Sequence, residues 1–508
     1  MFNSLRIAAA APHTQTGRID HNTAVIIETI KAAGYEKASL LILPENAVTG
    51  ECGADACGLR HVIKSKKAAV VEIKKAAIAN NVDVFLGKEQ LTNACTSDYD
   101  CCGIEIYLHP DTTLAGKWSQ TRRCLISASK DVSSICVCVQ SAPTETVSRG
   151  VHGGGILICA NGAVLAERMP LSQEDSVIYA DIRIPAPSAN PFFPSNRADY
   201  PEFCREIFAI QTHALAGRLS NTGLDPVINV SGGLDSALAL CVCAAALDML
   251  GKDRKNIQAL ILPGFGTSER TLKNARALPE FLGAYSGEID IKPACLQHFK
   301  DIGHAPDVYN TTYENTQARE RTQIALNVAN MRSGMMIGTG NMSEIALGFS
   351  TFGGDALSMY NPNCGLTKTA VIEVVRWISE SGTFGKEVSE ILDSIIQTPI
   401  SPELLPPKAG EISQITEKTV GPYELVDFFL YHTVKKRYAP KTITAIAVQA
   451  FCGKFTDEEV RGWLDVFNKR FFGNAFKRFC MPEGPRIFDV FLSADAFYLP
   501  GDVGNLQE

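Results

Sequence analysis

The residues best suited to chemistry lie in the string Ser231-Gly-Gly-Leu-Asp-Ser236, directly after the apolar run Pro226–Val230. A strand that enters two glycines and then opens a helix presents unpaired backbone N–H groups to an anion. Ser231 and Ser236 add hydroxyl donors, and Asp235 adds a carboxylate that can hold or orient a metal ion. There is no lysine in the string, so a P-loop grip on a γ-phosphate is not indicated. The pattern predicts an anion-binding loop, and the alternative is a turn that is tight only for packing.

The segments around this loop must place it at the end of a sheet. We expect helix Tyr200–Leu219, the strand already named, helix Ser236–Leu250 and strand Ile257–Leu262. This alternation predicts an α/β unit with a parallel sheet. Upstream, the stretch Ile184–Ser195 carries four prolines in twelve residues. Such a stretch is neither a helix nor a central strand, so it predicts a domain boundary.

The N-terminal part shows a second alternating pattern. Helices are expected at His21–Ala33 and Lys64–Asn80, between apolar strands, which again indicates an α/β layer fold. The expected strands are Leu5–Ala10, Ala38–Leu43, Val82–Gly87, Ile104–Leu108, Ser134–Gln140, Gly155–Cys159 and Ala163–Glu167. Asn161-Gly162 between the last two strands predicts a two-residue hairpin turn.

Composition excludes several classes of protein. The 508 residues are 45% hydrophobic, which indicates two to three folded domains. With 48 basic and 55 acidic residues the net charge is −7, so the basic footprint of a nucleic-acid-binding protein is missing. The longest apolar run, Ala237–Leu247, has eleven residues and is too short to span a bilayer. Met1–Pro12 lacks the apolar core of a secretory signal, so a cytoplasmic protein is expected. None of the sixteen cysteines forms a CxxC pair, and most are expected to be buried thiols.

Residues 200–490 resemble the NAD⁺ synthetases of the ATP pyrophosphatase superfamily. This resemblance narrows the predicted function of the anion-binding loop. The matching strings include Leu262-Pro-Gly-Phe265, Tyr313–Arg319, Gly338–Glu344, Gly354-Asp355, Leu366–Thr369 and Phe476-Lys-Arg478. The resemblance implies a parallel-sheet domain of the adenine nucleotide alpha hydrolase type. It also implies a reaction in which the carboxylate of deamido-NAD⁺ attacks the α-phosphorus of ATP. Pyrophosphate leaves, and ammonia then displaces AMP to form NAD⁺.

The same resemblance implies roles for individual residues. Asp235, Glu344 and Lys368 would be catalytic, with Asp235 and Glu344 binding Mg²⁺ and Lys368 neutralising phosphate charge. The residues implied for ATP are Ser231, Gly232, Gly233, Leu234, Ser236, Thr339 and Lys477. The residues implied for deamido-NAD⁺ are Arg319, Asn341 and Asp355.

Some of these residues have plainer interpretations. Arg319 could form a solvated ion pair on a helix, and Asp355 could be a turn residue after two glycines. Lys477 could be one of two adjacent surface charges, and Glu344 a favourable charge near a helix N-terminus.

Residues 1–182 resemble a shortened nitrilase-type amidase, the domain that supplies ammonia from glutamine in glutamine-dependent synthetases. The segment Leu43-Pro-Glu-Asn-Ala-Val-Thr-Gly50 would place Glu45 as the general base. Tyr107 stands where the resemblance expects the nucleophilic cysteine, and the lysine segment is missing between Gln90 and Cys101. A phenol with a pKa near 10 is a weak nucleophile, so we expect a degenerate domain that acts as a scaffold.

The predicted organisation is therefore a nitrilase-like α/β sandwich domain (1–182), a linker (183–199), an ATP pyrophosphatase domain (200–490) and a tail (491–508). The predicted function is ammonia-dependent NAD⁺ synthesis, with ATP, deamido-NAD⁺ and Mg²⁺ bound, in a homodimer or larger homo-oligomer. One alternative is a glutamine-dependent enzyme in which Cys101 or Cys102 replaces the missing thiol. Others are a different ATP pyrophosphatase, such as a GMP or asparagine synthetase, and a nucleotide-binding regulatory protein.

Overall fold

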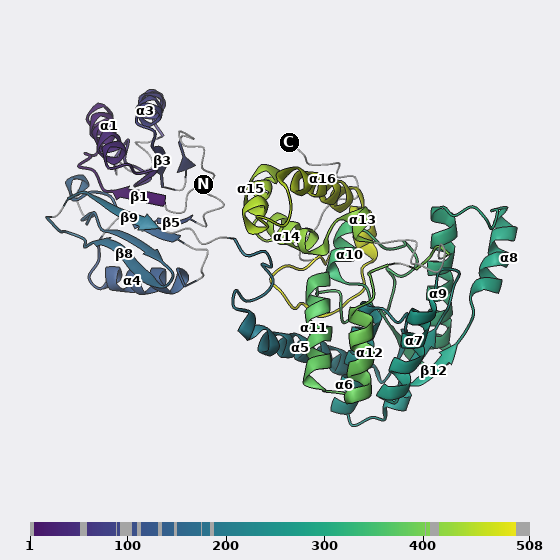
Figure 1. The fold of residues 1–508 in the computed structure, drawn as a ribbon. Helices are drawn as coiled ribbons and strands as arrows, with labels where there is room; N and C mark the ends of the chain where they lie inside the picture. The colour runs from purple at the N-terminus through teal and green to yellow at the C-terminus, as the bar shows by residue number, and fades with distance from the viewer. Residues whose placement is uncertain are drawn as a thin grey trace. The chain divides into compact units, whose positions relative to one another are not determined.

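The structure is a computed structural model of the chain, drawn in Figure 1. It describes residues 5–50, 58–87, 89–91, 104–108, 113–130, 135–146, 150–173, 175–182, 187–401, 403–406 and 416–493. The chain divides into two compact units, Met1–Ala186 and Pro187–Glu508. The division falls inside the proline-rich stretch Ile184–Ser195, where prolines interrupt regular backbone hydrogen bonding.

The first unit carries two sheets and three α-helices among its described residues. Its strands are β1 (Leu5–Ala10), β2 (Leu40–Leu43), β3 (Asp83–Leu86), β4 (Glu89–Gln90), β5 (Ile104–Leu108), β6 (Ile135–Val139), β7 (Ile156–Ala160), β8 (Ala163–Arg168) and β9 (Val177–Ile182). Its helices are α1 (Ile19–Tyr35), α3 (Arg60–Ala79) and α4 (Lys117–Ala128), with a 3₁₀ turn η2 at Pro143–Glu145.

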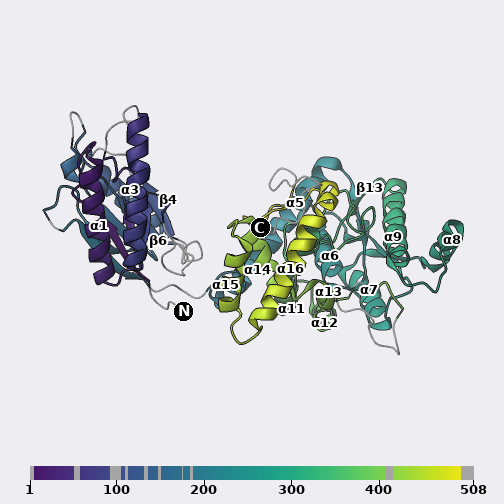
Figure 2. The same cartoon turned by 90° about the horizontal axis from the view of Figure 1, so that it is seen from above.

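The two sheets of this unit pack face to face between layers of helices. One sheet has the order β4-β3-β2-β1-β9 and the other β5-β6-β7-β8. Ile7 and Ala9 of β1 join the apolar core between the sheets, whereas Ala8 and Ala10 pack toward α1 and α3. Helices α1 and α3 lie side by side, as both views show (Figures 1 and 2). Both faces of β1 are largely buried, and five of its six residues are apolar, as expected of an inner strand; the exception is the half-buried Arg6.

The hairpin between β7 and β8 is confirmed. Asn161 and Gly162 have φ of +53° and +73°, the left-handed conformation that a type I′ turn needs at both central positions. By contrast, β9 was not predicted from the sequence. It pairs antiparallel with β1 at the edge of the sheet, and its half-exposed residues leave only a weak apolar pattern.

Among its described residues, the second unit contains one sheet and most of the helices. Its strands are β10 (Asp225–Asn229), β11 (Gln258–Ile261), β12 (Tyr285–Glu288) and β13 (Gly334–Ile337). Its helices are α5 (Tyr200–Thr222), α6 (Leu234–Met249), α7 (Glu269–Leu282), α8 (Lys292–Ile302), α9 (Thr311–Met331), α10 (Met342–Leu347), α11 (Lys368–Ser381), α12 (Lys386–Ile396), α13 (Glu417–Val420), α14 (Tyr423–Val434), α15 (Pro440–Ala450) and α16 (Asp457–Gly473). Short 3₁₀ turns are η3 (Arg197–Asp199), η4 (Arg254–Asn256) and η5 (Ala475–Cys480).

The sheet of the second unit is parallel throughout, with the order β12-β11-β10-β13. Residues of β10, β11 and β13 share an apolar core with α8 and α9 on one face. Helix α6 begins directly after β10, and α5 and α11 pack against it. Because β10 is an inner strand of a parallel sheet, the loop at its carboxyl end is where such sheets bind ligands.

Local signals explain where several helices begin and end. Asn310 caps α9, since its side chain accepts the N–H groups of Thr312 and Tyr313. Thr456 and Glu459 form a reciprocal capping box at the start of α16. In the part of the chain that the structure describes, no helix is both long and apolar enough to cross a lipid bilayer.

Candidate active site

The predicted anion-binding loop joins β10 to α6, as the sequence indicated. Gly232 has φ of +81°, and a Cβ atom there would lie 2.2 Å from the carbonyl oxygen of Thr271 on α7. Only glycine therefore permits this close approach of two backbones. Gly233 is the N-cap of α6, so the first N–H groups of that helix follow it.

The two serines of the loop hydrogen-bond each other. Their hydroxyl oxygens are 3.0 Å apart, and the Ser231 N–H donates to Oγ of Ser236 at 3.2 Å. Ser231 is exposed, whereas Ser236 is buried and donates to the carbonyl of Gly233 at 3.1 Å. Ser236 thus stabilises the loop, and Ser231 is the serine that faces solvent. The side chain of Leu234 is buried, which leaves only its backbone for contact with a ligand.

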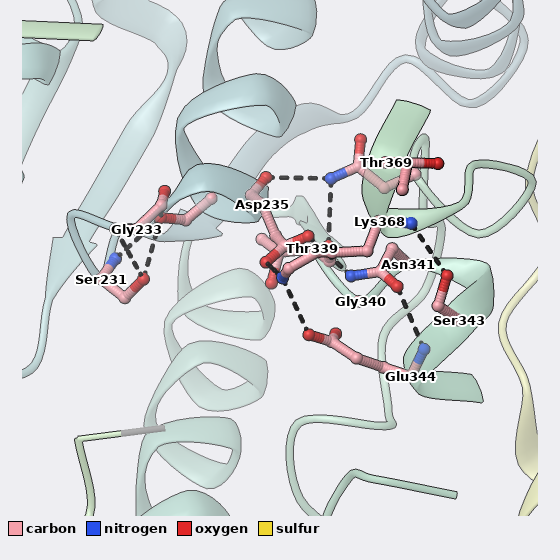
Figure 3. A network of polar contacts seen from close by, with 12 residues as sticks. Ser231, Gly233, Asp235, Thr339, Gly340, Asn341, Ser343, Glu344, Lys368 and Thr369 are labelled. Carbon is pink, nitrogen blue, oxygen red and sulfur yellow. Dashed lines mark hydrogen bonds and ion pairs between the residues drawn. The ribbon is translucent and has the colours of Figure 1, made fainter. Parts of the chain in front are cut away.

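Lys368 lies between the two predicted carboxylates (Figure 3). Its Nζ is 2.5 Å from Oδ2 of Asp235 and 3.0 Å from Oε1 of Glu344. Asp235 lies in the first turn of α6, Glu344 in the first turn of α10, and Lys368 is the first residue of α11. Three helix N-termini therefore meet at one site, and their partial positive charge favours phosphate groups.

Burial sets the electrostatics of this triad. The side chain of Lys368 is 2% exposed, and those of Asp235 and Glu344 are 21% exposed. Burial raises the pKa of Glu344 to about 7, and Asp235 adds to this while Lys368 opposes it. Burial alone would lower the pKa of Lys368, but the two carboxylates raise it above its usual value. Lys368 consequently remains an ammonium ion.

The triad fits part of a magnesium site. Two carboxylates share one ammonium, and Oε2 of Glu344 has no hydrogen-bond partner among the described residues. No group of three or more His, Cys, Asp or Glu side chains suited to a metal occurs in that part of the chain. Mg²⁺ commonly binds one or two carboxylates and completes its shell with water and substrate phosphates. Asp235 and Glu344 match that donor set.

Asn341 contacts the carboxylate of Asp235 and the backbone of Glu344. Its Nδ2 donates to Oδ1 of Asp235 at 2.8 Å, and its Oδ1 accepts the N–H of Glu344 at 3.0 Å as the cap of α10. The side chain is fully buried. Its predicted contact with deamido-NAD⁺ stays a prediction, because here both ends of the amide are occupied. Thr339, predicted to lie by ATP, is half-buried just after β13.

Asn363 is a site residue that sequence reasoning missed. Its Nδ2 donates to the backbone carbonyls of Asp235 and Thr339, at 2.9 and 3.0 Å, and it is fully buried. Its Oδ1 accepts from Gln211 of α5 at 3.0 Å. Asn363 thereby ties the start of α6 to the segment after β13. No local pattern marks it, because its partners are distant in sequence.

The remaining predicted residues converge on the segment after α10. Lys477 Nζ donates to the carbonyls of Gly348 and Ser350, at 2.7 and 2.8 Å. Arg319 is exposed and donates to the carbonyl of Phe352, and Asp355 is exposed and accepts the Thr351 N–H. Lys477 thus holds the backbone that follows α10. Its role toward ATP, and those of Arg319 and Asp355 toward deamido-NAD⁺, remain predictions.

In the first unit, Glu45 is an exposed residue of the turn that follows β2. Cys136, Cys138 and Cys159 are buried in the core beneath α4, where burial raises the pKa of Cys138 to about 12 and of Cys159 to about 11. Such thiols are not nucleophiles at neutral pH. Cys101, Cys102 and the segment that would carry the lysine lie outside the described residues, and of Tyr107 only its backbone place in β5 is described.

Comparisons with known proteins match both units of the chain. Residues 210–454 match the family model described as NAD synthase, and this segment contains Asp235, Glu344 and Lys368. A solved glutamine-dependent NAD⁺ synthetase from Cytophaga hutchinsonii superposes with a TM-score of 0.50 at 17% identity, covering 98% of this chain and 97% of its own. This likeness extends over both units and confirms the predicted α/β fold of each.

Curated relatives with similar sequences are also named glutamine-dependent NAD⁺ synthetases. A glutamine-dependent NAD⁺ synthetase from Mycobacterium leprae (strain TN) is 38% identical over 320 residues, covering 58% of this chain and 47% of the relative. One from Rhodobacter capsulatus is 29% identical over 357 residues, covering 68% of this chain and 58% of the relative. The chain thus spans about half the length of the curated relatives it matches. The resemblance to NAD⁺ synthetases of the glutamine-dependent type is confirmed.

Proposed function

We propose that this chain is an NAD⁺ synthetase, a ligase that converts deamido-NAD⁺ to NAD⁺ through an adenylated intermediate. ATP is consumed, and AMP and pyrophosphate are released. The observation that carries the proposal is the position of Lys368 between Asp235 and Glu344, next to the anion-binding loop. The name shared by the relatives supports the same reaction.

The residues of the site suit phosphoryl chemistry, in which positioning and electrostatics dominate. The loop Ser231–Ser236 would bind the β- and γ-phosphates through N–H groups at the start of α6. The ammonium of Lys368 would offset the charge that grows as pyrophosphate leaves. Asp235 and Glu344 would hold Mg²⁺, which when bound supplies further positive charge to the phosphates. Asn341 and Asn363 would keep Asp235 in place through the hydrogen bonds described above.

We further propose that free ammonia is the nitrogen donor. The first unit retains Glu45, but the three thiols on its described strands, Cys136, Cys138 and Cys159, are buried. Cys124 is exposed on α4, and Tyr107 stands at the position where the resemblance expects the cysteine. A glutamine-dependent enzyme with a thiol supplied by Cys101 or Cys102 is the second candidate, and the names of the relatives favour it.

One assay tests the function and both candidates. Purified chain is given deamido-NAD⁺, ATP and Mg²⁺, with ammonium or glutamine supplied separately, and NAD⁺ and AMP are measured by chromatography. We expect NAD⁺ and AMP in equal amounts with ammonium. ATP turnover without NAD⁺ would refute the synthetase function, and absence of any turnover with either donor would do the same.

The resemblance also leads us to propose a homodimer or larger assembly formed through the second unit, in the cytoplasm. Symmetric dimers are the commonest assemblies of soluble proteins. Sedimentation at the concentration used for the assay tests this proposal. A monomer with full activity would contradict it.

A further inference from the structure

Asp427 on α14 is a buried carboxylate that touches both catalytic segments. It is 1% exposed. Its Oδ1 accepts a hydrogen bond from the hydroxyl of Ser343, and its Oδ2 accepts the N–H and the hydroxyl of Thr369, at 3.0 and 2.7 Å. Ser343 precedes Glu344 in the chain, and Thr369 follows Lys368. One carboxylate therefore holds the immediate neighbours of two proposed catalytic residues.

Further hydrogen bonds close this arrangement into a ring. Oγ of Ser343 accepts the backbone N–H of Lys368 at 2.8 Å, as Figure 3 shows. The N–H of Met342 donates to the carbonyl of Leu366 at 2.6 Å. The first turns of α10 and α11 are consequently locked to each other and to α14. A shift of either turn would change the distance between Glu344 and Lys368.

The charge of Asp427 is not neutralised by a basic side chain, since no Lys, Arg or His of the described residues forms an ion pair with it. Burial raises its pKa to about 6, while the hydrogen bonds from Ser343 and Thr369 oppose that rise. Burying a carboxylate without a cation is unfavourable. The carboxylate is therefore held by the hydrogen bonds from Ser343 and Thr369, which fixes these two residues relative to each other.

Tyr423 lies one turn before Asp427 on α14 and contacts the ammonium group of Lys368. The Nζ of Lys368 is 5.5 Å from the centre of the Tyr423 ring, which is 2% exposed. A cation over an aromatic face is attracted to it. Helix α14 thus contacts the ammonium group of Lys368 through Tyr423 and the next residue, Thr369, through Asp427.

We propose that Asp427 is a positioning residue for the synthetase reaction, which sets the relative placement of Glu344 and Lys368 through Ser343 and Thr369. This inference rests on the proposed function. Asp427 does not touch the reacting atoms, so its loss acts through the other residues. Supporting groups of this kind typically change activity by about 10- to 100-fold.

The test compares steady-state kinetics of Asp427→Ala, Asp427→Asn and Thr369→Val in the full chain, with ammonium as donor. The matched control is Leu430→Ala, a fully buried residue of the same helix. Melting temperatures are measured in parallel. We expect Asp427→Ala to lower kcat by about 10- to 100-fold while KM for ATP changes by less than about threefold, because ground-state binding by the loop is retained.

Asp427→Asn keeps an acceptor for Thr369 and should recover part of kcat. Thr369→Val removes one hydroxyl, keeps the N–H donor and covers the case in which the alanine variant does not fold. Leu430→Ala should lower the melting temperature and leave kcat near wild type. A kcat within about twofold of wild type for Asp427→Ala and Thr369→Val would overturn the inference. A loss of kcat in Leu430→Ala as large as that in Asp427→Ala would also overturn the inference. A wild-type chain that makes no NAD⁺ would instead overturn the proposed function, and the inference with it.

Discussion

The Nζ of Lys368 lies 2.5 Å from Oδ2 of Asp235, although 133 residues separate the two in the sequence. The ammonium is buried, so it is ordered before any ligand arrives, and it places a fixed positive charge beside the anion-binding loop. Preorganised charge of this kind stabilises a transition state without reorganisation during the reaction. The predictions below follow from this arrangement and from the contacts around it.

Asp235→Asn should abolish NAD⁺ formation, with a loss of at least about 100-fold, and leave the fold intact. The amide keeps the size of the side chain but removes the charge that Mg²⁺ and Lys368 require. The matched control is Asp248→Asn on the same helix, which breaks only an exposed ion pair with Arg254. Circular dichroism reports whether the fold is intact, and the ammonium-dependent assay reports NAD⁺ formation. Near wild-type activity in Asp235→Asn would refute the metal-binding role.

Gly232→Ala and Gly233→Ala should differ sharply although the residues are adjacent. At Gly232 the φ is +81° and a Cβ would collide with the carbonyl of Thr271, whereas at Gly233 the nearest atom is 3.5 Å away. We expect Gly232→Ala to lower the unfolding free energy by about 1–3 kcal/mol. Gly233→Ala should keep its stability, and any loss of activity would then report obstructed approach of the phosphates. Urea titration compares them, and equal stability losses would contradict the backbone argument.

His432 should make the second unit sensitive to acid. It is buried against Phe428, and burial, with a smaller effect of Lys436, lowers its pKa to about 3. The unfolded chain binds a proton below about pH 6.5, but the folded chain does not until about pH 3. Stability is therefore complete above pH 6.5 and falls as the pH drops toward 3.

The measurement is the unfolding free energy of His432→Phe and wild type between pH 8 and pH 4. The stability difference between the variant and wild type should grow by about 3 kcal/mol as the pH falls from 8 to 4, in favour of the variant. His298→Phe, at an exposed position, is the control and should leave the pH profile unchanged. Parallel profiles for wild type and His432→Phe would show that His432 is not the source.

Ammonium should support NAD⁺ formation far better than glutamine. Amide hydrolysis by a nitrilase fold needs a thiolate, a lysine and a glutamate acting together, and loss of one member of such a set costs orders of magnitude. Glu45→Ala should leave the ammonium-driven rate almost unchanged, because Glu45 is an exposed residue of the other unit. Equal rates with glutamine, lost in Cys101→Ala or Cys102→Ala, would show that another thiol has taken over.

Local sequence determined the parts of this protein that depend on neighbours along the chain. The loop Ser231–Ser236 follows from a strand, two glycines and a helix start, all within ten residues. The hairpin at Asn161-Gly162 follows from the left-handed φ that these two residue types accept. The resemblance carried by short strings also named Glu344 and Lys368, and the structure brings both to Asp235.

Only the tertiary structure decided how these groups are held. Asn363 and Asp427 carry no local signal, yet each joins segments that lie far apart in the chain, with Asp427 reaching Ser343 across 84 residues. The amide of Asn341 bridges Asp235 and the start of α10, a contact that the sequence did not indicate. The physical reason is that a buried polar group must find its partner wherever packing places one. That partner is set by the arrangement of whole helices and strands rather than by the residues beside it.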